Sequence, residues 1–136
     1  MKVALKFLRR LGSRGTAAIE FALVFPVFLT MIFGIIEISR LIWWQVALER
    51  GAAVGSRCGA VVAPDCETDG QIAAKAANSA YSLPFAPANF VVQRQSCGVR
   101  VTATAEFKTA TGLVGMLDST LSATFCHPLT QGLDIP

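Results

Sequence analysis

Apolar residues form one long run near the N-terminus, and shorter patterned segments follow it. Residues 16–36 read TAAIEFALVFPVFLTMIFGII, in which Glu20 is the only charged residue. A helix needs about 20 mainly apolar residues to cross roughly 30 Å of hydrocarbon. The run therefore predicts a membrane-spanning helix. A cleaved secretory signal is the alternative, but its apolar core is usually shorter and no A-x-A site follows Ile36.

The helical pattern continues past the membrane segment. Ile38, Leu41, Leu48 and Ala52 keep an apolar stripe at helical spacing, which predicts one helix from residue 16 to about residue 58. Trp43 and Trp44 follow the apolar run by one to two turns, a position that favours the outer membrane interface over ordinary packing.

A second helix is predicted over residues 71–82, with Thr68 and Gln71 as a capping box. Small residues recur on both helices at spacings that allow close approach. They are Gly51, Gly55 and Gly59 on the first helix, and Ala73, Ala76, Ala77 and Ala80 on the second. This pattern favours a contact within the chain, and an interface with a neighbouring subunit is the alternative.

From residue 89 the chain changes to β-type alternation. Residues 89–95 and 98–108 predict a hairpin, and residues 120–126 predict a third strand. We therefore expect an α+β protein: a long N-terminal transmembrane helix carrying a small head with a short helix and an antiparallel sheet of about three strands. The expected division is a basic leader (residues 1–15), the membrane-spanning and protruding helix (16–59) and the head domain (60–136).

Charge is distributed unevenly along the chain. The net charge is +3, but five of the twelve basic residues lie in the first fifteen positions. From residue 16 onward the chain has seven basic residues and nine Asp and Glu residues, so the net charge of this part is negative. Basic residues before a membrane helix predict a cytoplasmic N-terminus and an extracytoplasmic head. A nucleic-acid-binding protein would instead carry its basic residues on the folded domain.

The head is small, so its apolar core alone gives limited stability. The four cysteines are expected to stabilise it by forming disulfides. Three pairings are possible. Cys58 and Cys66 bracket a short loop, and Cys97 and Cys126 lie at strand ends, so these two disulfides are favoured. The cysteine spacing fits no zinc site and no C-x-x-C redox motif. His127, the single histidine, is most simply a surface residue, so we expect no metal, no cofactor and no enzymatic activity.

The junction between leader and helix carries the most informative motif. The stretch RRLGSRGTAAIEFALVFP places Gly15 and Thr16 just before the apolar run and Glu20 with Phe21 inside it. A carboxylate at the edge of hydrocarbon is costly and calls for a partner. If the chain is cut after Gly15, Glu20 becomes the fifth residue, one helical turn from the new α-amine of Thr16. The alternative is an unpaired acid at the headgroup level.

This motif resembles the class III prepilin signal of type IV pilins, in which a prepilin peptidase cuts after Gly and residue five is Glu. Gly15 and Glu20 match, and Phe21 stands where the common Flp pilins carry Tyr. The segment RGTAAIEFALVFPVFLTMIFGIIEISRLIWWQVALERGAAVGSR resembles the signature region of the TadE-like family, including Gly34, Glu37 and Arg40 of its G-I-I-E-x-x-R pattern. The resemblance is strong over about residues 9–59.

The resemblance implies a non-catalytic minor pilin, or pseudopilin, for assembly of a Flp-type type IV pilus by the tight-adherence secretion system. Its implied partners are the prepilin peptidase, other pilin-like subunits, the assembly machinery and the lipid bilayer. Its implied location is the bacterial inner membrane, with possible incorporation into a pilus. Two alternatives stay open: an uncleaved, membrane-anchored binding or adhesion domain, and an envelope enzyme.

Overall fold

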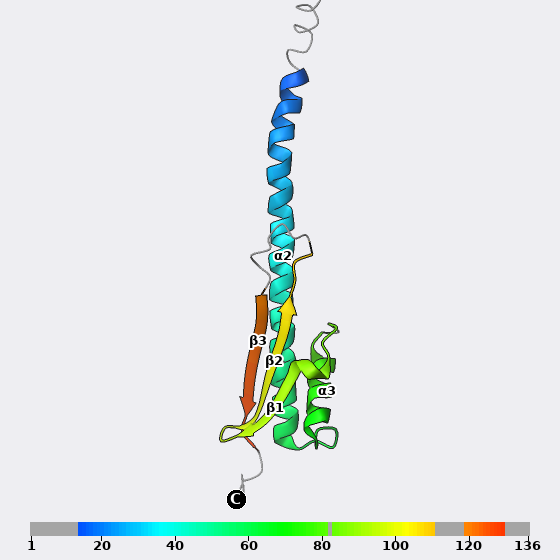
Figure 1. Ribbon diagram of the computed structural model, residues 1–136, viewed down its shortest axis with the longest axis vertical. Coiled ribbons are helices and arrows are strands. Elements are labelled where there is room, and N and C mark those ends of the chain that lie inside the picture. The colour runs from blue at the N-terminus through cyan, green and yellow to red at the C-terminus, as the bar shows by residue number, and fades with distance from the viewer. Residues whose placement is uncertain (1–13, 82, 111–118, 130–136) are drawn as a thin grey trace, which may run out of the picture. The chain divides into compact units, whose positions relative to one another are not determined.

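The computed structural model describes residues 14–81, 83–110 and 119–129 (Figure 1). Most of the basic leader and of the GLVGMLDS segment before the third strand lies outside these residues. The helical elements are α2 (Arg14–Val61), α3 (Asp69–Ser79) and the 3₁₀ turn η1 (Pro87–Asn89). The strands are β1 (Phe90–Gln95), β2 (Gly98–Phe107) and β3 (Ser119–His127).

The chain divides into two compact units, Met1–Glu37 and Ile38–Pro136, and α2 supplies residues to both. In the first unit, large apolar side chains of α2 are exposed along its length. Among the described residues, α2 is the one helix that is long and apolar enough to cross a membrane. The mean hydropathy of its most apolar segment is 2.4. This helix is compatible with single-pass anchoring.

The second unit contains a three-stranded antiparallel sheet in the order β1-β2-β3. In the central strand β2, alternate side chains are buried, so one face of the sheet packs inward and the other faces solvent. A tight turn at Ser96 and Cys97 joins β1 to β2, and Gly98 follows it with φ +116°. The register pairs Val92 with Val101 and Val101 with Phe125.

The core of the second unit lies between α2, α3 and the inner face of the sheet. Leu48 and Ala52 of α2, Ile72 and Ala76 of α3, and Val101 of β2 are completely buried there. The small residues of α2 allow α3 to pack closely against it. A Cβ atom built on Gly55 would lie 3.0 Å from Ala76 Cβ, and one on Gly59 would lie 2.7 Å from Ile72 Cδ1. The Gly/Ala contact is therefore within the chain, as the favoured interpretation predicted.

The N-terminus of α3 is capped as the sequence predicts. Gln71 N donates a hydrogen bond to Thr68 Oγ1 over 3.3 Å, and Thr68 N donates one to Gln71 Oε1 over 3.0 Å. These bonds satisfy two backbone donors that have no partner inside the helix. At the other end α3 stops at Ser79, three residues before the expected end, because Tyr81 takes a left-handed backbone with φ 50°.

Two disulfides join parts of the head. Cys58 near the end of α2 is bonded to Cys66 in the following loop, and Cys97 of the hairpin turn is bonded to Cys126 of β3. These are the two pairs that the sequence favours. The long apolar helix, the short helix, the three antiparallel strands and the disulfide-bonded head confirm the expected α+β class.

Candidate functional site

The candidate processing and assembly residues lie in the first turns of α2. The backbone of Gly15 and Thr16 belongs to the first helical turn, and Glu20 follows Thr16 by one further turn. Glu20 is exposed on the helix surface. Among the described residues, no hydrogen bond or ion pair joins Glu20 to another residue. Its carboxylate is therefore open to a partner from outside this part of the chain.

Phe21 adds an aromatic surface beside Glu20. Its ring is exposed and stacks on that of Phe25, one turn further along, with ring centroids 4.9 Å apart and planes 24° apart. Aromatic pairs at this spacing stabilise a helix and fix the rings against each other. The exposed carboxylate is thus followed by an exposed pair of stacked rings on the same helix.

The two charged residues of the G-I-I-E-x-x-R pattern are not simple surface charges. Glu37, the last residue of the first unit, is buried. In the second unit, the guanidinium carbon of Arg40 lies 5.7 Å from the ring centroid of Phe107, at cation–π distance. The sequence identified both residues through the family pattern, but it gave no sign of their surroundings, because Phe107 is far away along the chain.

The two tryptophans have different environments. Trp44 packs against the core, with its ring edge-on to Phe85 at 5.2 Å and to Phe107 at 5.8 Å. Trp43 is exposed, and its ring lies 5.2 Å from that of Tyr81. The expectation that both tryptophans share the membrane interface is therefore wrong for Trp44. Neighbouring residues on a helix point about 100° apart, so one faces the core while the other faces outward.

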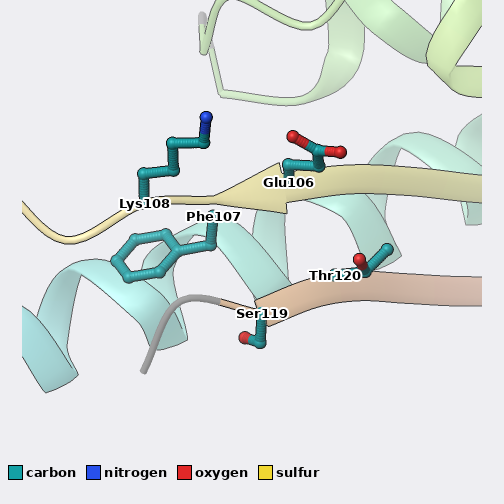
Figure 2. A pocket seen from close by; sticks show the side chains of 5 residues that line it. All are labelled: Glu106, Phe107, Lys108, Ser119 and Thr120. Carbon is teal, nitrogen blue, oxygen red and sulfur yellow. The ribbon is translucent and has the colours of Figure 1, made fainter. Parts of the chain in front are cut away.

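A shallow hollow lies at the end of the sheet where β2 and β3 meet (Figure 2). Its volume is about 250 Å³, and it is lined by Glu106, Phe107, Lys108, Ser119 and Thr120. Figure 2 shows Glu106 and Lys108 on one side of β2 and Phe107 on the other. Ligand sites are usually larger and more apolar, with a few converging polar groups. This hollow offers no such arrangement.

The cysteines and the histidine take their expected structural places. All four cysteines are in disulfides, so none of them offers a thiol nucleophile or a thiolate ligand. His127 ends β3, and its Nδ1 lies 3.4 Å from the carbonyl oxygen of Pro128. Within residues 14–81, 83–110 and 119–129, no group of three or more His, Cys, Asp or Glu side chains is placed to bind a metal ion.

Comparison with known proteins places the similarity in the N-terminal part of the chain. Residues 15–57 match the family model described as TadE-like protein. No curated protein and no solved structure matches the chain. The matched segment begins at Gly15, contains Glu20, Phe21, Glu37 and Arg40, and ends one residue before Cys58. The resemblance to the TadE-like family that was drawn from the sequence is confirmed over this segment, which is about a third of the chain.

Proposed function

We propose that this protein is a minor pilin, or pseudopilin, that serves assembly of a Flp-type type IV pilus by the tight-adherence secretion system. The match to the TadE-like family suggests a role related to Tad pili, and pilin-related proteins of this kind are in general not enzymes. The finer role rests on the organisation of α2 and of the head.

The observation that carries the proposal is where the family match begins. The matched segment starts at Gly15, the residue after which the expected cut falls, and it excludes the residues before it. The match therefore includes both sides of the proposed junction, with Gly15 before the cut and Thr16 after it. Glu20 and Phe21 then follow at positions five and six of the released chain.

Cleavage would change the electrostatics of the helix end. It would create a positive α-amine at Thr16, one helical turn from the exposed carboxylate of Glu20. A carboxylate in the hydrocarbon costs roughly 2.5–3.5 kcal/mol on the insertion scale. Pairing with an α-amine on its own or a neighbouring chain offsets this cost. Because charges interact strongly where the dielectric is low, such a pair sets the register between packed helices.

The proposal also assigns location and partners. The protein is a single-pass protein of the bacterial inner membrane, with its N-terminus in the cytoplasm and its head outside. The prepilin peptidase removes the leader, and other pilin-like subunits and the assembly machinery receive the mature helix. The two disulfides fit the oxidising compartment in which the head is placed.

The test is pilus formation by Glu20 variants in a strain that carries the complete system. Glu20→Ala should insert into the membrane and be cleaved, but it should fail to support assembly. Glu20→Asp should support an intermediate level of pilus assembly, because it keeps the charge but its side chain is shorter. Glu106→Ala removes an exposed carboxylate from β2 and serves as the control, with normal assembly expected. Wild-type assembly by Glu20→Ala would show that Glu20 is a passive interfacial acid.

A further inference from the structure

The two edges of the three-stranded sheet differ in their surroundings. β1 forms one edge, and α3 contacts it (Figure 1). Arg94 places a charge on β1, and its Nη2 lies 3.5 Å from Oδ1 of Asp69 at the start of α3. A covering helix and a charged side chain are two means by which proteins keep an edge strand from pairing with another chain. The edge at β1 is therefore protected.

β3 forms the other edge, and its own sequence contains no such protection. Its nine residues, STLSATFCH, include no Lys, Arg, Asp or Glu, no proline and no glycine. They pair with β2 in one unbroken register from Ser119 to His127. An edge strand of this length and regularity offers a continuous row of backbone groups to a further strand. β3 is therefore the edge at which the sheet can be extended.

Two hydrogen bonds show which backbone groups of β3 point outward. Asn89 Nδ2 donates to the carbonyl oxygen of Thr104 over 2.9 Å, so the backbone groups of Thr104 point toward the β1 side of the sheet. Thr104 pairs with Ser122, and backbone direction alternates along antiparallel strands, so the N–H and C=O of Ser122 point away from β2. Gln45 Nε2 donates to this carbonyl oxygen over 3.2 Å, which agrees with the assignment.

The same alternation points the backbone groups of Thr120 and Thr124 outward, and both residues are exposed. Within the described part of the chain, no hydrogen bond joins another group to these outward groups. Together with Ser122 they form what we call the open edge of β3. Phe125 pairs with the fully buried Val101, so it lies on the core side of the strand, yet 41% of its surface is exposed. A strand added at the open edge would cover this ring.

A negative charge lies beside the open edge. The Glu49 carboxylate accepts a hydrogen bond of 2.9 Å from Gln45 Nε2, the same nitrogen that donates to Ser122. Glu49 is exposed, so its charge is accessible to a partner. A segment that fits this edge is therefore extended, has an apolar residue beside Phe125 and carries a basic residue within reach of Glu49.

We propose that the open edge binds an extended segment of a different protein, another pilin-like subunit of the same assembly, which adds to the sheet as a fourth strand. Main-chain hydrogen bonds to the open edge supply affinity, and contacts with Phe125 and Glu49 supply selectivity. The described strands of this chain do not fit the same edge: β3 has no Lys or Arg, the arginine of β1 is paired with α3, and β2 is central. The identity of the partner rests on the pilus role proposed above, but the strand addition does not.

Removal of one outward N–H tests the strand addition. Thr124→Pro removes this donor, and an edge strand tolerates proline where the N–H faces solvent. Thr124→Val is the matched control, because it also lacks the hydroxyl that bonds to Thr102 but keeps the N–H. In a strain with the complete system, Thr124→Pro should lower the number of pili severalfold and Thr124→Val should not. Wild-type pilus number with Thr124→Pro, or an equal loss in both variants, would overturn the proposal.

Photo-cross-linking identifies the partner and decides the matter even if the proline variant does not fold. The probe p-benzoylphenylalanine replaces Thr124 in the full-length protein, and Thr104 in the control. Both side chains are exposed, but Thr104 lies in the central strand. We expect a cross-link to another pilin-like subunit from position 124 and none from position 104. A cross-link to a second copy of this chain, equal cross-linking from both positions, or none from position 124 would overturn the proposal.

The two proposals fail in different ways. If pili form normally in a strain that lacks this protein, the proposed function is wrong, whereas the cross-link from position 124 still decides the strand addition. If pili require the protein but Thr124→Pro assembles them normally, the strand addition alone is wrong.

Discussion

Gly51 of α2 lies directly against Phe90 at the start of β1. A Cβ atom built on Gly51 would come within 2.7 Å of Phe90 Cε1 and 2.9 Å of the Ala76 carbonyl oxygen. Real Cβ atoms do not approach other atoms so closely, and the backbone carbonyl cannot rotate away as a side chain does. The absence of a side chain at Gly51 therefore lets α2, α3 and the sheet meet.

Replacing Gly51 should destabilise the head. We expect Gly51→Ala to lower its unfolding free energy by about 1–3 kcal/mol, the usual cost of forcing extra atoms into a packed core. Gly70→Ala is the matched control, because a Cβ atom there meets nothing within 4 Å and alanine favours the helix. Chemical denaturation followed by circular dichroism measures both. Equal stability of the two variants would contradict the packing described for Gly51.

The capping box of α3 makes a second prediction. Thr68→Ala removes the oxygen that accepts from Gln71 N, so it should cost about 1 kcal/mol. Thr68→Ser keeps an acceptor at the same place and should restore most of the loss. The measurement is the denaturation midpoint of the three proteins. A serine variant as unstable as the alanine variant would show that the methyl group of Thr68, not its hydroxyl, matters.

The two disulfides should differ in their resistance to reduction. Cys97 is exposed, and Arg100 Nη2 donates to its Sγ over 3.9 Å, a contact that favours a thiolate leaving group. Cys66, in contrast, is only 1% exposed. Under limiting dithiothreitol, alkylation and peptide mapping should find Cys97 and Cys126 modified before Cys58 and Cys66.

Arg100→Gln sharpens the disulfide prediction by removing the charge. It should slow reduction of the Cys97–Cys126 bond, whereas Arg94→Gln, which removes an exposed arginine 3.5 Å from Asp69, should not. If Cys58–Cys66 were reduced first, exposure would not determine the order of reduction. If Arg100→Gln left the reduction rate of Cys97–Cys126 unchanged, Arg100 would not promote that reduction.

Local features of this fold could be predicted from the sequence, because they depend on neighbouring residues. The apolar run, the strand alternation and the Thr68–Gln71 capping box are of this kind. The features that escaped prediction, such as the surroundings of Trp44 and Tyr81, depend on distant contacts. Trp44 faces Phe85 and Phe107, and Tyr81 takes a left-handed backbone against Trp43. Trp44 lies three residues after Leu41 and four before Leu48, so it shares their helical stripe and Trp43 does not, but the aromatic partners of Trp44 follow only from the position of the sheet.

The candidate site was found through a motif rather than through packing. Gly15 and Glu20 were identified by their resemblance to a prepilin signal, and the family match covers both. Their partners are expected to come from other molecules, so a single chain does not contain the geometry that would test their roles. The roles of Thr16 and Phe21 stay predictions for the same reason, and the domain division at residues 15 and 59 also stays a prediction.

Gly15 itself can be tested without disturbing the fold. A Cβ atom built on Gly15 meets nothing within 4 Å, so Gly15→Val has room in the folded chain. Any loss of processing then reflects the peptidase pocket, which should reject a branched residue. Gly34→Val is the control, because Gly34 also has free space and lies far from the junction. We expect uncut precursor for Gly15→Val and normal processing for Gly34→Val on an immunoblot.

The central claim is that this protein is a processed, pilin-like membrane subunit, and the mass of its N-terminus tests this most directly. The protein should be purified from matched strains with and without the prepilin peptidase and measured intact by mass spectrometry. We predict a chain that begins at Thr16 when the peptidase is present, and a chain that keeps the leader when it is absent. A retained leader in both strains would contradict the claim and favour an uncleaved, membrane-anchored binding domain.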